Sequence, residues 1–169
     1  MRGVLPYGFM RMGEREPVAE ADKDSGFSEF GAGFEAAEEL DAYRAVYRLV
    51  LTAYGYRCAL TGTVFAPDPA PGLDLLHPDL DVVAIRSREA GGPLQIDNFL
   101  ALEKAVSRAF RAGQILVDDD YWVIPDLNVL NPDIAARLHP GGRLLVPAEP
   151  LFQPSRAHLA FHRRSVLGA

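Results

Sequence analysis

The chain has 169 residues, of which 49% are hydrophobic and 24% charged, and it carries a formal net charge of −6. This length and composition predict one folded domain with a substantial core. The single cysteine, Cys58, excludes an internal disulfide framework, and no apolar run reaches the roughly 18 residues that a membrane-spanning helix needs. The low thiol content and the lack of an apolar signal segment at the N-terminus together favour the cytoplasm.

The acidic excess is confined to the start of the chain. Residues 1–41 hold ten acidic and four basic residues, which leaves thirteen of each kind in the rest of the chain. We therefore expect an acidic, partly flexible arm at 1–33 and a folded domain at 34–169. An apolar cluster in the arm is compatible with docking onto this protein or onto a partner, and equally with a frayed end. It comprises Val4, Leu5, Tyr7, Phe9 and Met10.

The first half of the domain alternates helix and strand patterns. Apolar residues at three- and four-residue steps predict a helix from 34 to 54, which Gly55 ends. A hairpin around Thr61-Gly62 and a proline-rich loop at 66–72 follow. The next predicted elements are a buried strand at 80–85, a Gly-Gly loop at 86–97, a short strand at 98–102 and a helix at 103–112 before Gly113.

The second half is predicted to hold short elements and a last helix. Runs at 114–117 and 121–124 indicate a hairpin whose acidic turn, Asp118 to Asp120, is expected to be solvated. A short helix at 131–138, a strand at 143–146 and a helix at 154–166 follow. His158 and His162 have a metal-binding spacing on the last helix, but no acidic third ligand lies beside them, so we expect a packing role.

Several sequence pieces together resemble a known family. They are YGYRCALTG, the strand LDVVAIRS, the Gly-Gly loop, Asn98, a helix that closes FRAGQI and the tail PSRAHLAFHRRSVL. Over residues 43–167 the chain is similar to the restriction-enzyme-like branch of the HNH endonucleases. The resemblance implies an α+β fold with an HNH-like ββα core, flanking helices and short hairpins. In that family a strand histidine is the general base, its preceding residue and a helix histidine hold a divalent cation, and an asparagine holds the loop.

The chain keeps the scaffold of this motif and departs from its chemistry. Ala84 stands where the resemblance places the general base, and Val83 and Ser107 stand at the two metal-ligand positions. Asn98 is retained, and Arg111 replaces the aspartate of the FDAG-like close. Hydrolysis of a phosphodiester needs a proton acceptor and a cation, which alanine and valine cannot supply or hold. We therefore expect no catalytic residue and no cofactor, and we expect Ala84, Asn98 and Ser107 to face one shallow pocket.

Two other groups of residues carry possible chemistry. His77, Asp79 and Asp81 have the types and spacing of replacement metal ligands, although the two aspartates also fit the solvated edge of a strand. A basic set is expected to converge at the degenerate site and to face DNA phosphates. It comprises Arg86, Arg88, Lys104, Arg108 and Arg111.

Three functions remain open at this point. The leading hypothesis is a non-catalytic DNA-associated or regulatory module that binds duplex DNA weakly, because the domain is charge-balanced and the acidic residues up to Asp41 compete with phosphate. The second is a protein-interaction or assembly module that contacts a partner through the N-terminal arm. The third is a metal-dependent HNH DNA endonuclease whose ligands have moved.

Overall fold

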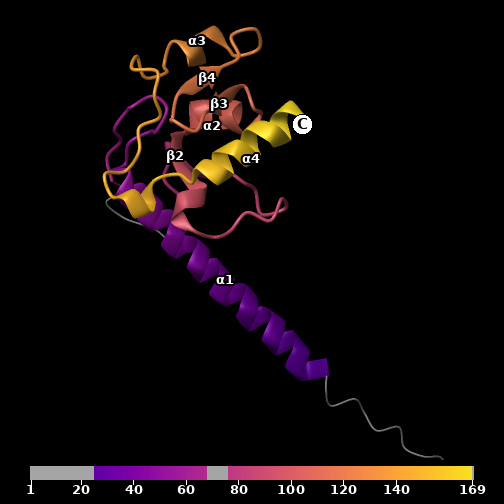
Figure 1. The fold of residues 1–169 in the computed structure, drawn as a ribbon. Coiled ribbons are helices and arrows are strands. Elements are labelled where there is room, and N and C mark those ends of the chain that lie inside the picture. The colour runs from indigo at the N-terminus through magenta and orange to yellow at the C-terminus, as the bar shows by residue number, and fades with distance from the viewer. Residues whose placement is uncertain (1–24, 68–75, 169) are drawn as a thin grey trace, which may run out of the picture. The chain divides into compact units, whose positions relative to one another are not determined.

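The computed structural model describes residues 25–67 and 76–168, and side chains from residue 38 onward (Figure 1). The chain divides into two compact units, Met1–Ala36 and Ala37–Ala169. The apolar cluster of the N-terminal arm and residues 68–72 of the proline-rich loop lie outside the described residues. None of the described helices combines the length and the apolar character that crossing a membrane requires.

The first helix, α1, spans Ser25–Ala53 and is longer than predicted. The sequence predicted that this helix begins at residue 34, and in the structure it begins nine residues earlier, at Ser25. No proline lies between Pro17 and Pro67, and the three glycines of residues 25–33 each cost only about 1 kcal/mol of helix propensity relative to alanine. The end of α1 agrees with the prediction, since Gly55 follows it with a φ of 59°.

The centre of the second unit is an antiparallel strand pair followed directly by a helix. β1, Leu80–Ala84, pairs with β2, Phe99–Glu103, in a register that places Val83 opposite Leu100. α2, Lys104–Arg111, begins at the residue after β2. All three elements lie within a residue or so of their predicted positions, and the predicted α+β class is confirmed.

The third and fourth strands form the predicted second hairpin. β3, Ile115–Val117, pairs antiparallel with β4, Val123–Pro125. The other expected strands are reduced to single bridges, one of which joins Arg57 to Val64 and the other Trp122 to Arg143. The reason lies in the backbone of Ala59, whose N–H donates to Ala101 (2.8 Å) and whose carbonyl accepts from Leu145 (2.8 Å). The hairpin keeps two local bonds, from the N–H of Cys58 to Thr63 and from the N–H of Phe65 to Tyr56 (both 2.9 Å), while Ala59 bonds to distant segments.

The remaining elements are short, apart from the last helix. They are η1 (Ile96–Asn98), α3 (Pro132–Ala135), η2 (Pro150–Phe152) and α4 (Arg156–Leu167). The side chain of Asn131 accepts the backbone N–H of Asp133 (2.8 Å), and this N-cap starts α3 where the sequence indicated a helix.

The core lies where α1, the β1–β2 pair, α2 and α4 meet. Its largest fully buried side chains include Phe110 of α2, Leu100 and Leu102 of β2, and Leu159 of α4. Cys58 is also fully buried in this cluster, which agrees with a structural thiol. The loop that follows β1 leaves this core at Ile85 and forms the wall of the site described next.

Candidate functional site

A cavity of about 640 Å³ lies beside the loop that follows β1. Its floor is apolar and includes Val82, Ala84 and Phe99 of the β1–β2 pair. The charged side chains that line it are Glu39 of α1, Arg86, Arg88 and Glu89 of the loop, and Arg111 of α2. We call this cavity the arginine pocket. Its volume is within the range of small-molecule sites, and its lining combines an apolar surface with charged groups.

Asn98 fixes the loop that forms one wall of the arginine pocket. Its side chain is only 1% exposed. Its Oδ1 accepts the backbone N–H of Arg86 (2.9 Å), and its Nδ2 donates to the carbonyls of Arg86 (2.9 Å) and Pro93 (3.0 Å). Both ends of the loop are therefore tied to one amide group. This is the role that the family resemblance implies for the retained asparagine.

Gly92 allows this closed loop to form. A Cβ atom at this position would lie 1.9 Å from the carbonyl oxygen of Arg86 and 2.9 Å from Nδ2 of Asn98. Both contacts are shorter than real Cβ atoms show, and the first one is to backbone that cannot rotate away. Only glycine therefore fits where the loop crosses over its own first residue.

Of the five basic residues in the predicted set, three line the arginine pocket. Arg86, Arg88 and Arg111 reach it, whereas Lys104 and Arg108 are exposed on α2 and are not part of its lining. The three α2 residues recur at four- and three-residue steps and so share one helix face, of which only the last, Arg111, is part of the lining. The set is therefore split between the pocket and the neighbouring helix surface.

The three arginines are held in different ways. The Nε of Arg86 donates to the carbonyl of Ala90 (2.8 Å), and its guanidinium lies 4.5 Å from the centre of the Phe161 ring on α4. Arg88 forms an ion pair with Glu39 of α1. Arg111 is exposed and has no salt bridge among the residues with described side chains. Arg86 is thus positioned by the fold, and the other two lie at the solvent.

Ser107 does not line the arginine pocket, so the expectation that it shares one with Ala84 and Asn98 was wrong. Its side chain is 1% exposed, and its Oγ donates to Oδ2 of Asp81 at 2.6 Å. Successive side chains on β1 point to opposite faces, so Asp81 and Val83 lie on one face and Ala84 on the other. α2 covers the face of Asp81, and the arginine pocket lies on the face of Ala84.

Of the candidate metal ligands, His77 and Asp81 are engaged with other partners, and Asp79 is exposed. His77 is buried, and its Nδ1 accepts the backbone N–H groups of Asp79 (3.1 Å) and Leu80 (3.0 Å). Its Nε2 therefore carries the proton and donates it to the carbonyl of Ala66 at 2.9 Å. Asp81 is bound to Ser107. Among the residues that the structure describes, no three His, Cys, Asp or Glu side chains are grouped to hold a metal ion.

His162 packs inside the domain. Its ring is stacked on Phe110 with centroids 4.3 Å apart, and the side chain is 7% exposed. Burial lowers the pKa of His162, because the charged imidazolium is poorly solvated there; the Phe110 carbonyl opposes this shift and the Arg163 charge adds to it. Within the part of the chain that the structure describes, neither ring nitrogen of His162 has a hydrogen-bond partner.

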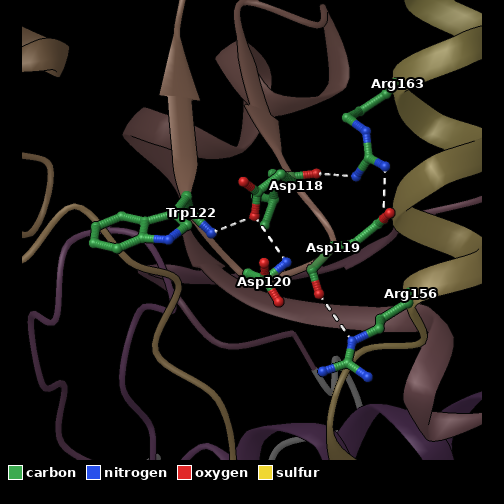
Figure 2. A network of polar contacts seen from close by, with 7 residues as sticks. Asp118, Asp119, Asp120, Trp122, Arg156 and Arg163 are labelled. Carbon is green, nitrogen blue, oxygen red and sulfur yellow. Dashed lines mark hydrogen bonds and ion pairs between the residues drawn. The ribbon is translucent and has the colours of Figure 1, made fainter.

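The acidic turn between β3 and β4 makes contacts that the sequence analysis missed (Figure 2). Asp118 accepts the N–H groups of Asp120 (2.9 Å) and Trp122 (2.8 Å) through Oδ1. Asp119 accepts from Arg163 of α4 through its carboxylate (2.6 Å) and from Arg156 through its carbonyl (2.8 Å). The turn therefore docks α4 and is not merely solvated. The sequence feature that could have indicated this contact is the presence of Arg156 and Arg163 on the last helix.

Comparisons with known proteins find a likeness at the level of structure. No family model and no curated protein matches the chain. Among solved structures, the chain is similar to one described as the modification-dependent restriction endonuclease TagI, with a TM-score of 0.54 and 25% sequence identity. The match covers 72% of this chain and 37% of that chain, so this chain spans little more than a third of the length of that protein. The α+β fold described above is therefore similar to that of part of a restriction endonuclease.

Proposed function

We propose that this chain is a catalytically degenerate relative of the HNH endonucleases that contacts the DNA backbone without cleaving it. The observation that carries the proposal is that Arg86, Arg88 and Arg111, from two separate segments, line one pocket whose floor includes Ala84. The likeness to a restriction endonuclease over 72% of the chain supports a nuclease-like module.

The loss of catalysis follows from the residues at the motif positions. Ala84 has no atom that can accept a proton, and Val83 is 1% exposed and has no ligand atom. Ser107 does not line the arginine pocket, and its hydroxyl group donates a hydrogen bond to Asp81. The family mechanism needs a base and two ligands at these places. Their joint absence favours a non-catalytic role over cleavage by relocated groups.

Binding of phosphate follows from the groups that remain. A guanidinium offers several N–H donors in one plane and suits phosphate oxygens. Asn98 and Gly92 fix the loop that carries two of these groups, so less side-chain and loop order has to be created on binding. The balanced charge of residues 42–169 keeps the expected affinity low.

The test is a titration of labelled duplex DNA with the full chain, followed by fluorescence anisotropy at several salt concentrations. We expect Arg111→Glu to weaken binding at least about threefold and to reduce the slope of log K against log salt by about one, as for one lost phosphate contact. Arg57→Glu is the matched control, because Arg57 is exposed and lies outside the pocket lining. Equal effects of the two variants would overturn the proposal.

The same samples test for catalysis. Wild-type protein is incubated with duplex DNA and Mg²⁺, Mn²⁺, Ni²⁺ or Zn²⁺, and we expect no cleavage. Cleavage that disappears in His77→Ala or Asp81→Ala would instead establish an endonuclease with relocated ligands. Since His77 is buried and bonded to backbone, a circular dichroism melt of each variant is needed to separate loss of function from loss of fold.

One observation favours the protein-interaction alternative. Four large apolar side chains at positions 122–129, on and beside β4, are 47% to 71% exposed. They are Trp122, Ile124, Leu127 and Val129. Exposed apolar groups that gather in one segment are typical of contact surfaces. If this segment mediates self-assembly, light scattering will show a concentration-dependent mass for the wild type that Leu127→Ser reduces.

A further inference from the structure

One ion pair joins α1 to the loop that forms the wall of the arginine pocket. The carboxylate of Glu39 forms an ion pair with the guanidinium of Arg88, 49 positions later in the sequence. Both residues line the pocket. The side chain of Arg88 is 76% exposed and that of Glu39 is 49% exposed. Exposed pairs of this kind contribute little to folding stability, so this one can exchange with other partners.

The two neighbouring arginines define what Arg88 can bind. Arg86 is held by the Ala90 carbonyl and the Phe161 ring, so its place is fixed. Arg111 is exposed and lines the same cavity. The carboxylate of Glu39 on Arg88 therefore shares this cavity with two further guanidinium groups. A phosphodiester oxygen carries the same charge and accepts the same hydrogen bonds.

We propose that Glu39 holds, in the free protein, the position on Arg88 that a nucleic acid phosphate takes in the bound protein. This inference rests on the proposed function and adds its regulation: DNA binds only by displacing an internal competitor. An attached carboxylate competes at high effective concentration, because α1 keeps it beside the pocket. Of the acidic residues among the first 41 positions, Glu39 is then the one that acts directly at the site.

The helix itself supplies a matched control. Glu38 precedes Glu39, and successive residues of an α-helix point about 100° apart. Glu38 is exposed, does not line the pocket and has no ion pair within the described side chains. Glu38→Gln and Glu39→Gln therefore change the net charge equally, and only the second removes the contact with Arg88. A difference in DNA affinity between these two variants therefore reports the competition of Glu39 for Arg88, and not the effect of net charge on DNA binding.

The experiment measures binding of the full chain to a short labelled duplex by anisotropy, at low and at near-physiological salt. We expect Glu39→Gln to bind about two- to fivefold more tightly than Glu38→Gln, which matches the modest value of an exposed pair. The gain should vanish when Arg88→Gln is added to Glu39→Gln, since the displaced partner is then gone. Unchanged circular dichroism melts will show that the variants are folded.

The outcomes separate this inference from the proposed function. If Glu39→Gln and Glu38→Gln bind equally well while Arg111→Glu still weakens binding, the pocket binds DNA and Glu39 is not its competitor. If Arg111→Glu has no effect and the Glu39→Gln gain survives the loss of Arg88, the proposed phosphate site is wrong. A gain specific to Glu39 and dependent on Arg88 supports both statements.

Discussion

The amide of Asn98 makes the most exacting prediction about stability. Asn98→Ala removes one acceptor and two donors, and leaves the N–H of Arg86 and the carbonyls of Arg86 and Pro93 without their partner. A buried polar group that loses its partner costs about 1–3 kcal/mol. Because water can reach part of the freed loop, we expect a total loss of about 2–4 kcal/mol in the free energy of unfolding.

A near-isosteric change separates the hydrogen bonds from packing. Asn98→Asp keeps the acceptor for the N–H of Arg86 but turns the other oxygen toward two carbonyls, which repel a buried carboxylate. We expect this variant to be at least as destabilised as Asn98→Ala at neutral pH and to recover part of the loss in acid. A protonated carboxyl can donate one of the two missing bonds.

Urea denaturation followed by circular dichroism measures these differences, and the fluorescence of Trp122 gives a second probe of the same transition. The control is Asn128→Ala, since Asn128 is exposed and donates only to the side chain of Asp126 (3.2 Å); we expect it to stay within about 0.5 kcal/mol of the wild type. If Asn98→Ala costs no more than this control, the loop is not held by the amide and the account of the site is wrong.

Two other predictions concern buried polar side chains. The pKa of His162 is lowered by burial from its usual value of 6.5, so the unfolded chain binds this proton more tightly. The stability that comes from the neutral ring is complete above pH 6.5 and is lost as the pH falls through the lowered folded value. Urea midpoints measured between about pH 7.5 and 5.5 should fall in the wild type and fall less in His162→Phe; identical slopes would contradict this. Separately, Ser107→Ala removes the donor to Asp81 and should cost about 1–2 kcal/mol. The double variant with Asp81→Asn should cost less than the sum of the single changes, and additive costs would show that the pair is not coupled.

The sequence was sufficient to predict the elements whose patterns are local. Gly55 and Gly113 mark helix ends and both have positive φ values, and the strand at 80–85 appears as β1 one residue shorter. The hairpin at Thr61-Gly62 was overestimated, because its backbone groups bond to Ala101 and Leu145, far away in the chain. Such tertiary bonds leave no periodic signal in a window of neighbouring residues.

In the candidate site, too, the sequence predicted the local features and missed those that depend on long-range contacts. Alternation along β1 follows from the geometry of any strand, yet which face receives α2 depends on packing, and this decided that Ser107 meets Asp81 and not the pocket. The pairing of Arg88 with Glu39 required a long-range contact between α1 and the loop. The sequence indicated acidic competition in general terms, but it gave no reason to single out one carboxylate.

The geometry also explains why the shape of the loop does not depend on the side chain at position 84. Asn98 and Gly92 act on backbone atoms of Arg86, so the loop closes whatever side chain stands at position 84. Replacing a polar side chain by alanine at the pocket floor leaves no unpaired buried group behind, so the change carries little stability cost. The same closure places Arg86 and Arg88 at the pocket lining. Under the proposed function, such a loop can face phosphate without any catalytic group, because its folding rests on Asn98 and Gly92 and its charge on the two arginines.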